Sequence, residues 1–287
     1  LHTGLRYGAS QAVLQAIAIT QRRTMAEVVA EEYGTVVSDR PIPVLAQSGD
    51  DRHSAADKMI LKRVPAITQG LFNQIEKVGA RGEVLLEYVR WLRDRVQRFG
   101  EADYEPVFHL DVYGMPGEVF SQDVEKVAEY LAALGREAAP HRLRIEAPVD
   151  GGDRDTTMKM MVSLRIALRS LKSDVEICAD DWCNTVEDVR AFAVAGAADM
   201  IQVKTPDLGS LTNSIEAAQI CKQNGVGVFL GGTCNGTDQS SRVTVNVAMG
   251  IQADLIYNKP GMGVDEGLMI VTNEMARILA LTKTGQS

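Results

Sequence analysis

Charged side chains stand where four predicted strands end. The stretches "FHLDVYG", "LRIEAP" and "EICADDW" place Asp111, Glu146 and Asp180 directly after or within apolar runs, and "IQVKTPDLG" does the same for Lys204. Neighbouring members of this series are 24 to 35 residues apart, which is about one strand–helix unit. If the strands are parallel, three carboxylates and one amine are expected at the same edge of the sheet.

Three carboxylates that converge in a partly buried site repel one another, and a divalent cation relieves that repulsion. Ligation by carboxylate oxygens, with positions left for water and substrate, suits Mg²⁺ better than Zn²⁺. Beside such an ion, a partly desolvated lysine has a lowered pKa, so Lys204 is a candidate general base. This arrangement abstracts a proton alpha to a metal-bound carboxylate and stabilises the resulting enediolate.

The less specific interpretation is that each residue is a helix cap or part of a surface ion pair. Any single charged residue at a strand end fits that interpretation. Four of them in consecutive units favour catalysis. The two-residue period of a strand supports this, because it puts His109 on the same face as Asp111, and Gln202 on the same face as Lys204.

Eight short apolar runs predict the strands that carry these residues. They cover residues 43–46, 59–61, 107–112, 143–147, 175–179, 200–203, 226–230 and 255–257, and the second run is the weakest. Amphipathic helical segments separate most of them, for example residues 82–99, and Asn184 is predicted to cap another. This alternation predicts an α/β fold, a (β/α)8 barrel of the TIM type. An open, doubly wound sheet is the alternative, but no GxGxxG or P-loop motif follows any strand.

Composition limits the partners of the chain. Its 287 residues carry a formal charge of −8, which argues against a nucleic-acid partner because phosphates are bound by clustered Lys and Arg. No apolar run approaches the length that spans a bilayer, so no membrane partner is expected. The four cysteines form no CxxC pair, which is typical of reduced thiols and indicates a cytoplasmic protein. One boundary is visible, near Arg40, where a leading helical segment gives way to the first strand.

Seven stretches together resemble methylaspartate ammonia-lyases of the enolase superfamily. They are "QSGDDR", "HLDVYG", "RIEAP", "ADDWCNTVEDV", "IQVKTPDLG", "GGTCN" and "KPGMGVDEG", and the likeness runs over nearly the whole chain. It implies Mg²⁺-dependent elimination of ammonia from L-threo-3-methylaspartate to give mesaconate, with K⁺ as activator, in glutamate fermentation. It also makes a homodimer plausible.

The resemblance assigns roles to individual residues. Asp111, Glu146 and Asp180 correspond to metal ligands and Lys204 to the base that takes the C3 proton. The positions that match substrate contacts are Gln47, Gln202, Thr233 and Cys234.

The chain departs from the family pattern in two places. Gln69 stands where the family often has a histidine base, and an amide cannot take a proton at neutral pH, although it can donate a hydrogen bond to the substrate. We therefore expect poor handling of the erythro diastereomer. Residues 1–40 are expected to be a helical junction from an N-terminal capping domain that is otherwise absent, and residues 41–287 the catalytic barrel.

Some alternatives stay open on the sequence. The same half-reaction serves a racemase or dehydratase acting on another carboxylate, and a barrel without its cap can be non-catalytic. Cys234 is a possible nucleophile, but no histidine is near it in sequence, so polar lining is the preferred interpretation. The glycine-rich loop 259–267 fits an anion-binding loop and a tight turn equally well.

Overall fold

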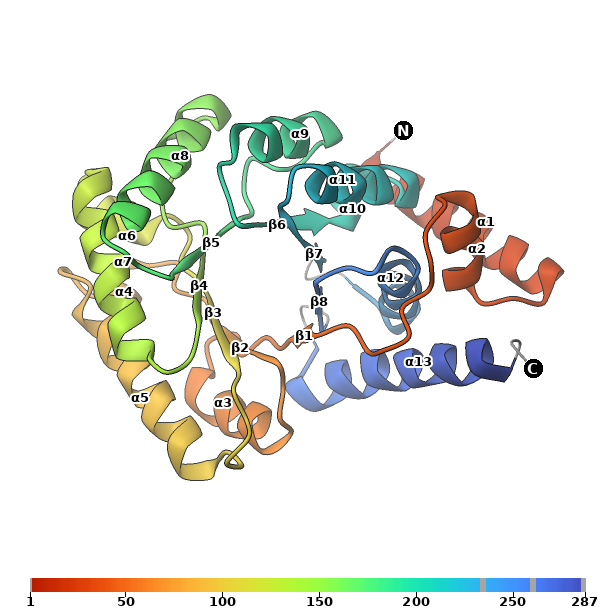
Figure 1. Ribbon diagram of the computed structural model, residues 1–287, viewed down its shortest axis with the longest axis horizontal. Coiled ribbons are helices and arrows are strands. Elements are labelled where there is room, and N and C mark those ends of the chain that lie inside the picture. Colours follow the sequence, from red (N-terminus) through yellow and green to blue (C-terminus); the bar gives the residue numbers. More distant parts are fainter. Residues whose placement is uncertain (1, 233–235, 259–261, 285–287) are drawn as a thin grey trace. The chain divides into compact units, whose positions relative to one another are not determined.

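The structure is a computed structural model that describes residues 2–232, 236–258 and 262–284 (Figure 1). Within these residues, eight strands form a closed barrel in chain order, and six of the pairs of neighbouring strands have a parallel register. The predicted (β/α)8 barrel is therefore confirmed. The strands are β1 (Val44–Leu45), β2 (Ala66–Gln69), β3 (Val107–Asp111), β4 (Leu143–Glu146), β5 (Glu176–Ala179), β6 (Met200–Lys204), β7 (Gly227–Gly231) and β8 (Leu255–Tyr257).

Helices follow the strands and also precede the first one. They are α1 (Thr3–Gln21), α2 (Met25–Glu32), α3 (Arg52–Leu61), α4 (Ile75–Val78), α5 (Glu83–Phe99), α6 (Met115–Val119), α7 (Val124–Ala138), α8 (Arg154–Ser170), α9 (Val186–Ala195), α10 (Thr205–Leu208), α11 (Leu211–Gln223), α12 (Asp238–Ile251) and α13 (Val264–Thr284). Among these described helices, none has the length and apolar character that crossing a membrane requires. The predicted helical segment at residues 1–40 corresponds to α1 and α2.

The chain divides into two compact units. One consists of residues 45–182 and 191–201, and the other of residues 1–44, 183–190 and 202–287. In the first unit, α7 packs against both α5 and α8 and against β4 (Figure 1). The contact face of α5 is an apolar stripe at helical spacing, since Leu85, Val89, Leu92 and Val96 are buried. Burial of this stripe holds α5 against its neighbouring helices α3, α4 and α7.

In the second unit, α12 is the central helix. It contacts α2, α11, α13 and β8, and every residue from Val243 to Ile251 is buried. A helix that is buried on all sides needs partners for its polar side chains. Asn246 meets this need, because its Oδ1 accepts a hydrogen bond from the backbone N–H of Ala26 at 3.1 Å. This bond ties the start of α2 to α12.

Two local predictions were wrong. Residues 59–61, predicted as the second strand, are the last turn of α3, and the second strand is instead Ala66–Gln69. The N-cap of α9 was predicted to be Asn184 but is Thr185, one residue later. The backbone N–H of Asp188 donates to Thr185 Oγ1, and the N–H of Thr185 donates to Asp188 Oδ2, both at 3.1 Å. This reciprocal pair satisfies two backbone donors at the start of α9.

Candidate functional site

Three carboxylates from consecutive strands lie together in the first unit. Asp111 and Glu146 are the last residues of β3 and β4 and pair with each other in register, and Asp180 follows the last residue of β5. One oxygen from each of them lies within 4.8 Å of the others. All three are buried, with exposures of 2%, 0% and 6%. The carboxylates predicted to converge therefore do so.

The electrostatics of this cluster are those of acids held close together away from water. Burial raises the pKa of Asp111 well above its ordinary value, the charge of Asp180 adds to the increase, and a hydrogen bond from Tyr113 opposes it. Asp111 Oδ1 is buried and has no hydrogen-bond partner among the described residues. An acceptor oxygen left in this state costs free energy unless something positive meets it. Three hard oxygen donors of this kind suit Mg²⁺.

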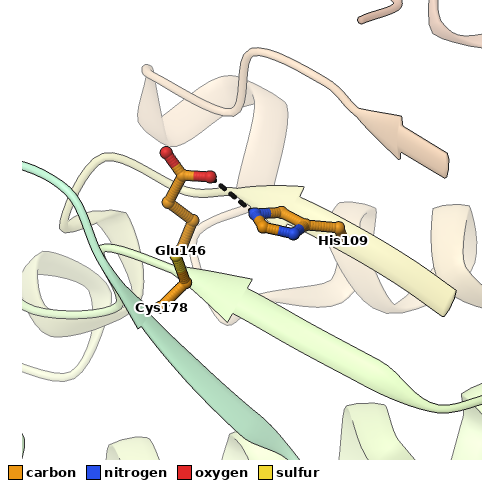
Figure 2. Close-up of side chains that lie close together, drawn as sticks. All are labelled: His109, Glu146 and Cys178. Atoms are coloured by element: carbon orange, nitrogen blue, oxygen red, sulfur yellow. Dashed lines mark hydrogen bonds and ion pairs between the residues drawn. The ribbon is translucent and has the colours of Figure 1, made fainter. Parts of the chain in front are cut away.

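His109, which lies on β3 two residues before Asp111, contacts the acid cluster. His109 Nε2 lies 2.6 Å from Glu146 Oε2, and neither side chain has any exposure to solvent. Figure 2 shows the imidazole facing the Glu146 carboxylate, with Cys178 on the neighbouring strand. Burial, and then the positive charge of Arg144, lowers the pKa of His109 well below its ordinary value. Because an ionised carboxylate can only accept, Nε2 is the donor in this hydrogen bond.

Beside the histidine, on the two strands that follow β3, lies an ion pair. Arg144 pairs in register with both His109 and Glu176. Its Nε donates to Glu176 Oε2 at 2.8 Å, and its side chain is only 8% exposed. These strands therefore carry the acid cluster at their carboxyl ends and, two residues earlier, His109 beside the ion pair of Arg144 and Glu176.

Two of the glutamines singled out in the sequence belong to this unit. Gln69 ends β2, is buried, and donates a hydrogen bond from Nε2 to Asp111 Oδ2 at 3.3 Å. Its amide therefore contacts the acid cluster directly. Gln47 lies two residues after β1 and is half-buried.

Gln202 and Lys204 lie in the other unit, on β6. Gln202 is buried against Gly231, the last residue of β7, where a Cβ would approach Gln202 Cγ to 2.6 Å. A side chain larger than that of glycine at position 231 would therefore displace Gln202. Lys204 is half-buried, ends β6 and precedes α10. Thr233 and Cys234 lie outside the described residues, as does the start of the glycine-rich loop, residues 259–261.

From the sequence, His109 was only a marker of strand geometry, and no role was predicted for Tyr113 or Cys178. A signal for His109 was present in the pattern. "HLD" and "RIE" on adjacent strands put a histidine and an arginine two residues before each acid, on the same face. The strand register that brings His109 to Glu146 was not visible in the sequence.

Two family models together match nearly the whole chain. A family model described as methylaspartate ammonia-lyase C-terminus matches residues 36–284, and the corresponding N-terminus model matches residues 1–34. The methylaspartate ammonia-lyase of Clostridium tetanomorphum is 50% identical over 283 residues, which are 98% of this chain and 68% of that protein. The chain belongs to the methylaspartate ammonia-lyase family. It spans about two thirds of the length of that relative.

Solved structures of family members share the fold. The Mg complex of β-methylaspartase from Clostridium tetanomorphum has a TM-score of 0.96 and 49% identity, over 99% of this chain and 69% of that one. The Citrobacter amalonaticus methylaspartate ammonia-lyase containing (2S,3S)-3-methylaspartic acid has a TM-score of 0.96 and 45% identity, with the same coverage. Sequence identity at this level shows membership of the same family and not only the same barrel fold.

Proposed function

We propose that this chain eliminates ammonia from L-threo-3-methylaspartate and releases mesaconate, with Mg²⁺ as cofactor and K⁺ as activator. The observation that carries the proposal is the cluster of Asp111, Glu146 and Asp180, with ligand oxygens within 4.8 Å of one another, in a member of this family. The relative solved as a Mg complex and the relative containing 3-methylaspartic acid support the choice of metal and substrate.

In this proposal Asp111, Glu146 and Asp180 hold the metal. When bound, Mg²⁺ offsets the negative charge that grows on a substrate carboxylate as the neighbouring carbon loses its proton. The buried Asp111 Oδ1, which has no partner within the described part of the chain, fits this role. The strand ends that carry these acids are the part of a parallel barrel where catalytic groups are found.

Lys204 is the proposed base. It ends β6, as Asp111 and Glu146 end their strands, and a neutral amine there takes the C3 proton of the substrate. The C2–N bond then breaks, its electrons leave with the nitrogen, and the C2–C3 double bond forms. Gln47, Gln69, Gln202, Thr233 and Cys234 are the proposed contacts to the carboxylates and amino group. We also propose a homodimer.

The test is an assay of the purified chain with L-threo-3-methylaspartate, with Mg²⁺ and K⁺ or with a chelator. Ultraviolet absorbance follows the conjugated diacid, and a separate measurement follows ammonia. Lys204→Ala is expected to reduce kcat by about 10³-fold, within the range that a general base contributes, and to retain Mg²⁺ binding. Lys126→Ala is the matched control, since that lysine is 64% exposed on α7. Wild-type turnover by Lys204→Ala would refute the role of the lysine, and absence of ammonia release by the unaltered chain would refute the function.

A further inference from the structure

We propose that His109 is a positioning residue, whose Nε2–H holds the Glu146 carboxylate in the orientation that metal binding requires. The inference rests on the proposed metal site and extends it to a residue beneath the ligands. His109 would not contact the ion or the substrate. Its effect would be transmitted through Glu146.

The contact is short and fully enclosed. The 2.6 Å separation joins two side chains with no solvent exposure, so water does not compete for either group. Both residues sit on rigid strands, with His109 inside β3 and Glu146 at the end of β4. A donor fixed in this way limits rotation of the carboxylate about its terminal bond.

A second acid in the cluster is held in the same manner. Gln69 Nε2 donates to Asp111 Oδ2, and the other oxygen, Oδ1, is the one that has no hydrogen-bond partner among the described residues. A neutral donor therefore holds one oxygen of Asp111, and the other is available to an ion. His109 provides the equivalent donor for Glu146. The neighbouring cation, Arg144, is engaged by Glu176.

The alternative is that His109, Glu146 and Cys178 themselves form a metal site, since their ligand atoms also lie within 4.8 Å of one another (Figure 2). Imidazole, thiolate and carboxylate are donors that suit Zn²⁺. However, two ligands of a tetrahedral zinc ion lie about 3.3 Å apart, given metal–ligand distances of about 2.0 Å. The 2.6 Å between His109 Nε2 and Glu146 Oε2 is too short for two ligands of one ion and matches a charge-assisted hydrogen bond.

The experiment measures Mg²⁺ binding to the metal-free full chain by titration calorimetry, without turnover. His109→Met removes the donor and keeps a buried side chain of similar size. We expect it to weaken Mg²⁺ binding by about 10- to 100-fold, the usual cost of losing a group that orients a ligand. His109→Gln places an amide N–H near the position of Nε2 and is expected to stay within about threefold of the unaltered chain.

Cys178→Ala is the matched control, because it alters packing on the other side of Glu146 and leaves the hydrogen bond intact. It is expected to bind Mg²⁺ as the unaltered chain does. At saturating Mg²⁺, His109→Met is expected to recover most of its kcat, because the variant loses ion affinity and not the base. Should His109→Met not fold, His109→Asn replaces it, since its shorter amide does not reach Glu146.

Several results would overturn the inference. They are unchanged Mg²⁺ affinity in folded His109→Met or His109→Asn, equal losses in these variants and in His109→Gln, and an equal loss in Cys178→Ala. Tight Zn²⁺ binding that depends on both His109 and Cys178 would also overturn it, in favour of the alternative. Failure of the proposed function is distinguishable, since the unaltered chain would then bind Mg²⁺ without releasing ammonia.

Discussion

Two equally buried carboxylates have pKa values shifted in opposite directions by their different surroundings. Asp111 and Glu274 are each 2% exposed, yet their pKa values move in opposite directions. For Asp111, burial and the charge of Asp180 raise the pKa. For Glu274, burial acts in the same direction, but hydrogen bonds from Arg277 and Asn246 outweigh it, and the pKa falls below its ordinary value.

The partners explain the contrast. Glu274 lies on α13 and accepts bonds at 2.6 Å from both Arg277 and Asn246, so its charge is balanced within the fold. Asn246 in turn accepts from the backbone N–H of Ala26, so its amide links α2 to α12, and its bond to Glu274 links α12 to α13. The described donors to Asp111 are neutral, namely Gln69 and Tyr113. Glu274 therefore stabilises the fold through internal hydrogen bonds, whereas Asp111 is suited to bind an added cation.

The largest expected effect is on activity, from the acid cluster. Asp180→Asn removes a proposed ligand and is expected to lower kcat/KM by about 10³-fold or more, which corresponds to roughly 4 kcal/mol of transition-state stabilisation. Because it also removes like-charge repulsion, the metal-free variant should unfold at the same or a higher urea concentration. Mg²⁺ should raise the Tm of the unaltered chain and not that of the variant. A metal-free variant that is less stable than the unaltered chain would show that Asp180 does not repel Asp111.

The next effect is on stability, from the other acid. Glu274→Ala is expected to lower the free energy of unfolding by about 2 kcal/mol, through the loss of charged hydrogen bonds. The cost stays moderate because Arg277 and Arg242 are 46% and 39% exposed and remain solvated. Urea unfolding measures it, and kcat should be unchanged. Glu216→Ala, at an ion pair that is half exposed, is the control and should cost less than about 1 kcal/mol. A loss of turnover with normal stability in Glu274→Ala would show that Glu274 serves the reaction and not the fold.

The smallest effect is a pH dependence. The folded-state pKa of Glu274 is depressed, so its stabilisation is fully present above the unfolded-state pKa, about 4.3. It is lost as the pH falls through that value towards the folded pKa. Unfolding of the unaltered chain and of Glu274→Gln, followed from pH 7 to pH 3, should show a stability difference that shrinks in acid. A difference that grows in acid would mean that the carboxylate is not held in its charged form.

Most strands were predictable because their composition was unambiguous. The six strands from β3 to β8 lie within about one residue of the predicted runs, since each has apolar residues at two-residue spacing, for example Phe108 and Leu110 on β3. The prediction of the second strand was wrong because it relied on apolar residues alone. "MIL" at 59–61 is apolar but ends a helix, with Met59 and Ile60 buried and Leu61 71% exposed, whereas the real strand ends in the buried polar residues Thr68 and Gln69. A run of three apolar residues is too short to distinguish the 3.6-residue period of a helix from the two-residue period of a strand.

By itself the sequence determined the residue types at the strand ends, the alternation that builds a barrel and the family to which the chain belongs. Those properties are local, because they depend on composition and spacing along one segment at a time. Only the tertiary structure decided that Asp111, Glu146 and Asp180 approach within 4.8 Å, that Gln69 donates to Asp111 and that His109 donates to Glu146. These contacts depend on the register between strands and on side-chain direction, which arise when separate segments pack together and which no single segment encodes.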